Sequence, residues 1–190
     1  MTQRTLFYLA ELALVLSCCS TATAHYPQAR DYLTPKEIDL VKDAQELDKR
    51  INVFIKAAER RLVVIKGLDT NSKELKKDAE FWGDLPSGTR SELVGDIAKI
   101  LDAAIDNIDD VSSRDEKNPA LPRALRKLAG AASQIIEQLK PLQSSAADSA
   151  EVRNFDELME NAETIVQAAS KLSPEVVQPR KSKGEKAKTN

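Results

Sequence analysis

Apolar residues recur every three or four positions through most of the chain between residues 34 and 172. Because an α-helix turns once every 3.6 residues, this spacing gathers the apolar side chains on one face of each segment. The pattern predicts long amphipathic helices over residues 34–66, 89–111, about 119–141 and 149–172, and a short helix over 73–82. The predicted fold class is therefore all-α, an elongated antiparallel bundle of four long helices plus one short helix.

The first long helix has the clearest start signal. Thr34 can be the N-cap, Pro35 occupies the first helical position and Glu37 the third, which together make a capping box. No glycine or proline follows until Gly67, which can end the helix in a left-handed conformation. At 1.5 Å per residue, the pattern predicts one continuous helix about 45 Å long.

Two prolines and one tryptophan mark later features of the predicted bundle. Pro141 is expected to end or kink the third long helix, because proline lacks an N–H and clashes with the preceding turn. Pro174 is expected to stop the fourth. Trp82, the only tryptophan, is expected to cap one end of the core from the short helix, since buried aromatic residues usually serve packing.

The N-terminus has the three regions of an export signal. Arg4 supplies a positive start, residues 6–19 form an apolar run, and Ala22 and Ala24 make an A-x-A cleavage site that would leave His25 as the first residue. The predicted organisation is a signal peptide at 1–24, an extended lead-in at 25–33, a helical bundle at 34–172 and a disordered basic tail at 173–190.

Two alternatives to cleavage remain open. Residues 6–19 could stay in the membrane as an anchor, although the run is shorter than the roughly 20 residues that usually span a bilayer. Cys18 or Cys19 could instead be the acylated residue of a lipoprotein, although Leu16 stands where a small side chain is usual. Cleavage is the preferred interpretation, so we expect the mature chain to be exported to the periplasm or the cell exterior and not to span the membrane.

Cleavage would remove both cysteines and leave His25 as the only histidine. Zinc sites of the Cys/His kind, di-metal sites with a Glu-x-x-His pair on two helices, and triads with a histidine base are then excluded. The sequence carries no nucleotide-binding motif, and the formal net charge of -2 does not favour nucleic acid. We expect no cofactor, no metal and no enzymatic activity.

Charged residues suggest two surfaces. The first helix carries a basic half, for which two interpretations stay open: a solvated or inter-helix salt-bridge face, and a partner-binding face. Its members are Lys49, Arg50, Lys56, Arg60 and Arg61. An acidic row on the second long helix is interpreted as a solvated face, relieved by basic residues that begin the next helix. The row is Asp102, Asp106, Asp109 and Asp110, and the basic residues are Arg123, Arg126 and Lys127.

The segment from Tyr32 to Leu62 contains a T-P-x-E-I-D start followed by an A-Q-E-x-x-K-R-I run. It resembles the opening of secreted bacterial proteins of unknown function, over about one sixth of the chain. The resemblance implies an exported bacterial protein and implies no activity or site residue.

Three functional hypotheses follow. The preferred one is a non-enzymatic helical scaffold or protein-interaction module of the bacterial envelope, because wide apolar stripes occur without a reactive constellation. The first alternative is a small-molecule or lipid carrier with an apolar cavity between helices near Trp82. The second is an enzyme that uses carboxylates only, which requires a close Asp/Glu pair in a cleft.

Overall fold

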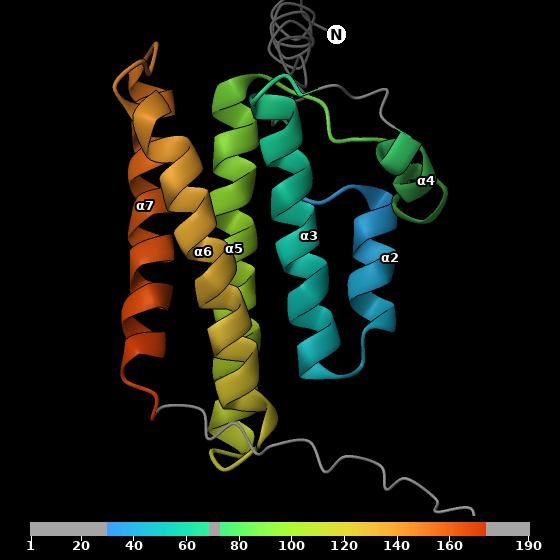
Figure 1. The fold of residues 1–190 in the computed structure, drawn as a ribbon, viewed down its shortest axis with the longest axis vertical. Coiled ribbons are helices and arrows are strands. Elements are labelled where there is room, and N and C mark those ends of the chain that lie inside the picture. The colour runs from blue at the N-terminus through green and yellow to red at the C-terminus, as the bar shows by residue number, and fades with distance from the viewer. Residues whose placement is uncertain (1–29, 69–72, 174–190) are drawn as a thin grey trace, which may run out of the picture. The chain divides into compact units, whose positions relative to one another are not determined.

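The computed structural model describes residues 30–68 and 73–173, which contain six helices and no strand (Figure 1). The helices are α2 (Pro35–Asp43), α3 (Leu47–Ile65), α4 (Lys73–Trp82), α5 (Arg90–Arg114), α6 (Ala120–Gln143) and α7 (Ser149–Ser170). The all-α prediction is confirmed. The predicted signal peptide, residues 25–29 of the lead-in and all of the basic tail after Ser173 lie outside the described residues.

Helices α3, α5, α6 and α7 pack together as a bundle around one apolar core. Leucine, isoleucine and phenylalanine fill the core, and fully buried alanines lie between them where helices approach closely. The largest buried apolar side chains are Ile51, Leu93, Ile97, Ile100, Leu101, Leu128, Ile135, Leu139, Phe155, Leu158 and Ile165.

Side-chain contacts show that two neighbouring helix pairs are antiparallel. Between α3 and α5, Arg50 bonds to Asn107 and Arg61 faces Asp96. The residue numbers on α5 therefore decrease as those on α3 increase. Between α6 and the end of α7, Gln143 bonds to Asp156 and Arg126 bonds to the backbone carbonyl of residue 173. Figure 1 shows the same alternation of direction along the chain.

The other two neighbouring pairs are parallel. Asn154 and Asn161 of α7 donate to the backbone carbonyls of Ser91 and Ala98 of α5, with a constant offset of 63 residues. Between α3 and α6, Asp48 pairs with Arg123 near one end, and Lys66 bonds to Gln138 near the other. The prediction of an antiparallel bundle is therefore correct for only two of the four neighbouring pairs, because consecutive α5 and α6 do not make the closest contacts.

The first predicted helix is in fact two helices, and this expectation was wrong. The chain leaves the helical conformation after Asp43 and re-enters it at Leu47, so that α2 lies beside α3 (Figure 1). The Arg50 side chain donates to the carbonyl of Ala44, the C-cap residue of α2. A continuous helix would hold Glu37 about 35 Å from Arg60, whereas the two side chains are 3.1 Å apart. A tertiary contact decides the break, and no proline or glycine marks it.

Other predicted ends are confirmed. Both hydrogen bonds of the Thr34–Glu37 capping box are present, with Pro35 in the first turn. Gly67 has φ 59°, and its N–H and that of Leu68 donate to Val64 and Val63, which completes a Schellman ending for α3. The short helix has the predicted bounds. Helix α6 differs from the prediction, because it continues through Pro141 and ends two residues later, at Gln143.

Candidate functional site

Four charged side chains lie inside the fold on the side where α2 meets α3 and α5. Glu37, Arg60, Arg61 and Asp96 are 0%, 2%, 1% and 5% exposed. Burying a charge is costly unless an opposite charge and hydrogen bonds compensate for the lost water. The partners of each group therefore determine what this cluster does.

Glu37 is the centre of the cluster. Its Oε1 accepts hydrogen bonds from Arg60 Nε at 3.1 Å and Arg61 Nη1 at 2.9 Å, and its Oε2 accepts from Arg61 Nη2 at 2.8 Å. Oε2 also accepts from the N–H of Thr34 as part of the capping box. One carboxylate thus caps the start of α2 and attaches this helix to α3 through two guanidinium groups.

Arg61 continues the network toward two other segments. Its guanidinium donates to the backbone carbonyls of Ala57 at 2.7 Å and Tyr32 at 2.6 Å, which fixes the segment that leads into α2. Its Nε lies 3.7 Å from Asp96 Oδ2 on α5, which is an ion pair without a direct hydrogen bond. Arg61 is therefore a hub for α2, α3, α5 and the preceding segment.

Arg60 attaches the loop that follows α4. Its Nη2 donates to the carbonyls of Gly83 at 3.1 Å and Asp84, and its Cζ lies 5.9 Å from the centre of the Trp82 ring. Burial lowers the pKa of Arg60, with the nearby Glu37 opposing that effect. Trp82 thus stacks against a buried cation and lies outside the apolar core, so the expectation that it caps the core was wrong.

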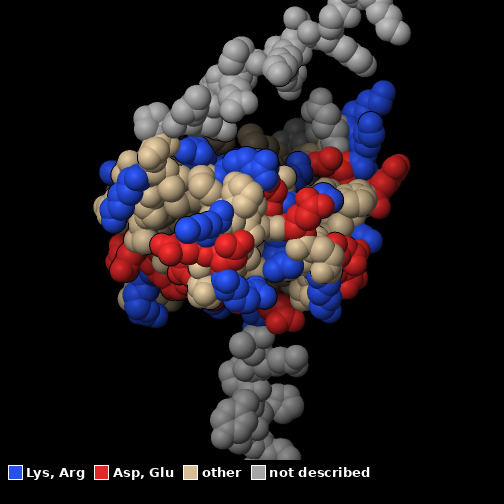
Figure 2. Space-filling model, turned by 90° about the horizontal axis from the view of Figure 1, so that it is seen from below, with Lys and Arg blue, Asp and Glu red and all other residues tan. Residues whose placement is uncertain are grey.

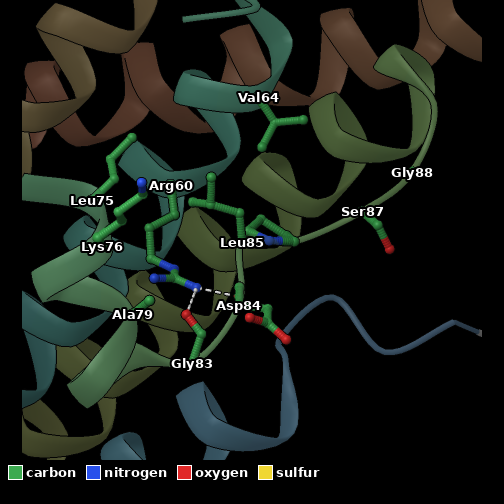
Figure 3. A pocket seen from close by; sticks show the side chains of 11 residues that line it. Arg60, Val64, Leu75, Lys76, Ala79, Gly83, Asp84, Leu85, Ser87 and Gly88 are labelled. Carbon is green, nitrogen blue, oxygen red and sulfur yellow. Dashed lines mark hydrogen bonds between the residues drawn. The ribbon is translucent and has the colours of Figure 1, made fainter. Parts of the chain in front are cut away.

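An open hollow lies beside this cluster (Figure 3). It measures about 560 Å³ and is bounded by α3, α4 and the loop 83–88. Arg60 lines it together with the apolar side chains Val64, Leu75, Ala79, Leu85 and Pro86, and with Lys76. It is the place in the described chain where a buried cation meets a ligand-sized space.

The apolar cavity predicted near Trp82 is thus replaced by a hollow of mixed polarity. A second hollow, between α5, α6 and α7, is smaller at about 180 Å³ and more apolar. It is lined by Ile105, Ile108, Asp109, Leu125, Leu128, Thr164, Ile165 and Ala168, and Trp82 is on a different helix. The two hollows therefore differ both in chemistry and in place.

The predicted basic face is divided by the fold. Arg60 and Arg61 are buried, so neither belongs to a solvated face or to a surface open to a partner. Arg50 is half-buried and bonds to Asn107, and Lys56 pairs with Asp78 of α4 at 2.7 Å. Lys49 is exposed and pairs with its neighbour in sequence, Glu46. The interpretation as an inter-helix salt-bridge face is therefore confirmed for Lys56, Arg60 and Arg61, whereas Arg50 makes an inter-helix hydrogen bond to a neutral side chain.

The acidic row is exposed as predicted, but its partners differ from those expected. Asp110 pairs with Arg114 of its own helix. Arg123 lies 3.0 Å from Asp48 of α3, and Lys127 pairs with the same residue, so neither serves the acidic row. The face seen in Figure 2 mixes both signs of charge without a large region of one sign.

A second ion pair joins the ends of α5 and α7. The Glu151 carboxylate accepts from Arg90 and from the N–H of Ala147, and Arg90 also donates to the carbonyl of Ser145 at 2.7 Å. The hydrogen bond from Arg90, followed by that from the Ala147 backbone, lowers the pKa of Glu151. The pair closes the end of the parallel α5–α7 contact.

Sequence reasoning missed Glu37 and Asp96 as members of a cluster, although a signal was present. Glu37 precedes buried Leu40 by three positions, and Asp96 precedes buried Ile100 by four. Both therefore lie on the buried stripe of their helices, as does Arg61. Glu37 and Asp96 come from different helices and both face Arg61, so they do not form the close acid pair that the carboxylate-only hypothesis requires. The third buried acid, Glu151, pairs with Arg90.

The predicted cleavage residues Ala22, Ala24 and His25 lie outside the described residues. Within residues 30–68 and 73–173, no group of three or more metal-ligating side chains comes together. None of the helices described is both long and apolar enough to cross a membrane. No protein-family model, curated protein or solved structure matches this chain.

Proposed function

We propose that this chain is an exported, non-enzymatic interaction module of the bacterial envelope, which binds a protein partner through the surface around α4. The observation that carries the proposal is the exposure of Phe81. This large apolar side chain is 60% exposed on α4, beside Trp82. An exposed aromatic residue next to a fixed backbone is a common anchor in protein interfaces.

The attachment of α4 supports this role. Lys56 pairs with Asp78 in the middle of α4, and Arg60 binds the two carbonyls that follow the helix. Because the helix is tied to the bundle at two points, Phe81 would be presented with little loss of conformational freedom on binding.

The use of charge inside the fold also favours a binding role. The buried acids Glu37 and Asp96 are neutralised by guanidinium groups, and the cluster connects three helices and two adjoining segments. Such a network stabilises one arrangement of elements, which suits a scaffold. The export signal at residues 1–24 is the basis for placing that scaffold in the envelope.

Site-specific photocrosslinking in the native envelope tests the proposal. A photoreactive residue at position 81 should crosslink to one protein species, whereas the same residue at exposed Val152 on α7 should not. Phe81→Ser should abolish capture without lowering the unfolding midpoint, because the side chain is mostly in water. Equal crosslinking at positions 81 and 152, or capture that survives Phe81→Ser, would refute the role of this surface.

Export is tested separately. Cell fractionation and intact-mass measurement should find a periplasmic or extracellular chain that begins at His25. A full-length chain in the membrane would support the anchor at residues 6–19, and an acylated chain beginning at Cys18 or Cys19 would support lipidation. A full-length chain in the cytoplasm would refute export.

A further inference from the structure

The hollow beside α4 contains an unusual donor. Arg60 is 2% exposed and lines the hollow, yet its hydrogen bonds involve only Nε and Nη2. No acceptor for its Nη1 is present among the residues that the structure describes. A guanidinium group has five N–H donors, so those of Nη1 remain available to a ligand or to water.

The walls of the hollow determine what such a ligand would look like. Apolar side chains from α3, α4 and the loop surround Arg60, namely Val64, Leu75, Ala79, Leu85 and Pro86 (Figure 3). Its volume of about 560 Å³ falls within the usual range for small-molecule sites. A ligand that fills it needs an apolar body and one strong acceptor.

The lining of the hollow holds more cations than acids, and Arg60 also pairs with Glu37, which it shares with Arg61. Arg60 and Lys76 line it, and the one acid among the lining residues is Asp84. The bond between Asp84 and Arg60 is made by the backbone carbonyl of Asp84 and not by its carboxylate. Hydrogen bonds between a guanidinium and a carboxylate are stronger than those to a neutral acceptor.

We propose that this hollow is a binding site for a small monocarboxylate with a short unbranched apolar chain. Arg60 Nη1 binds the carboxylate, Lys76 adds a second positive charge, and the apolar walls cover the chain. The inference does not rest on the interaction-module proposal, which concerns Phe81 on the exposed side of the same helix. The smaller hollow between α5, α6 and α7 lacks a cation and would accept neutral apolar molecules instead.

Titration of the full mature chain with hexanoate and octanoate tests the site. Trp82 is the only tryptophan and lies beside Arg60, so its fluorescence should respond to occupancy of the hollow. Calorimetry should give one site per chain. Methyl hexanoate, which keeps the shape and loses the charge, should bind at least about tenfold more weakly, as expected for the loss of one charge-assisted hydrogen bond.

Variants on α4 locate the binding. Lys76→Gln should weaken hexanoate binding about threefold, a fraction of one ion-pair contribution. Lys77→Gln is the matched control, because Lys77 is exposed on the same helix and does not line the hollow. Ala79→Phe should fill the hollow and abolish binding. Ala79 is exposed, so this variant should fold, and its circular dichroism and unfolding midpoint verify that.

Three results would overturn the proposal: no binding of either acid at millimolar concentration, equal affinity for acid and ester, or unchanged binding by Ala79→Phe. Arg60→Lys adds a second check that retains the charge and removes Nη1. It should weaken hexanoate binding by at least the factor found for the ester. If Arg60→Lys does not fold, the result for Ala79→Phe and the acid–ester comparison still decide the matter.

Discussion

The α5–α7 contact and the α2–α3 contact stabilise the same bundle by different means. Between α5 and α7, long helices bury apolar residues such as Ile97 and Leu158, and polar contacts are limited to two asparagines and one terminal ion pair. Between α2 and α3, nine residues of helix are fixed by a carboxylate that binds two buried guanidinium groups.

The difference reflects helix length. A helix of 22 residues such as α7 presents a long apolar stripe, and its one buried charge, Glu151, lies in its first turn. Helix α2 fully buries only Leu40 and Glu37, while Ile38 and Val41 pack partly buried against the core, so it has less buried apolar area than α7. Directional bonds from Arg60 and Arg61 supply the missing specificity. Each contact should therefore respond differently to substitution.

Glu37→Ala should have the largest effect. It leaves two guanidinium groups buried without their carboxylate, and removal of one partner of a buried ion pair typically costs about 3–5 kcal/mol. Urea unfolding at pH 7 measures the change. Glu46→Ala is the control, because its pair with Lys49 is exposed and should contribute under about 1 kcal/mol. Equal, small effects of both variants would show that the buried network does not stabilise the fold.

Leu158→Ala tests the apolar contact. Leu158 is fully buried on α7, and truncation of a buried leucine costs about 2–5 kcal/mol through lost burial and a cavity. The unfolding midpoint should fall without a change in the urea m-value. Val152→Ala, on the same helix but exposed, should lie within about 0.5 kcal/mol of the parent. A large effect at Val152 would indicate that this face is covered.

Glu151→Gln should have an intermediate effect that depends on pH. Arg90 and the Ala147 N–H lower the pKa of Glu151 in the folded state, so the ionised form is bound more tightly than in the unfolded chain. Its stabilisation is complete above the unfolded pKa of about 4.3 and is lost as the pH falls through the folded value. The difference in unfolding free energy between parent and variant should therefore be present at pH 7 and shrink in acid. A difference that is independent of pH would contradict this.

Asn161→Ala should have the smallest effect. Its Nδ2 donates to the Ala98 carbonyl at 3.1 Å, and loss of such a bond costs about 1 kcal/mol. Asn154, seven residues earlier on α7, makes the equivalent bond to Ser91. It lies beside Gly95, and a Cβ added to Gly95 would be 3.0 Å from Asn154 Nδ2. The double variant should lose about the sum of both single changes, measured by urea unfolding. If the double variant is as stable as the wild type, the two asparagines do not fix the register between α5 and α7.

The residue pattern was sufficient to predict local structure where the cause is local. The Thr34–Glu37 capping box, the ending at Gly67 and the bounds of α4 all depend on residues close in sequence. The same pattern failed between Asp43 and Leu47, where the turn is favoured by the bonds of Glu37 to Arg60 and Arg61, which are 23 and 24 residues from it in the sequence.

The candidate site was predicted less completely for the same reason. Arg60 and Arg61 were identified as part of a basic group, but they are buried because α2 packs against α3. Trp82 was expected in the core, yet the loop that follows it brings the ring to Arg60. A charged residue can lie on the buried stripe of a helix only when an opposite charge neutralises it. That partner is far away in the sequence, so the sequence does not show which residue it is.

The sequence by itself determined the helical class, the apolar stripes and most helix ends, because period, capping and turn preferences act within a few residues. The tertiary structure decided which helices are neighbours, that two pairs are parallel, and that Glu37 joins Arg60 and Arg61 in the interior. It also formed the hollow beside α4. The physical reason is that packing and charge compensation depend on distances in space. Those distances are set by contacts between residues that are far apart in the chain.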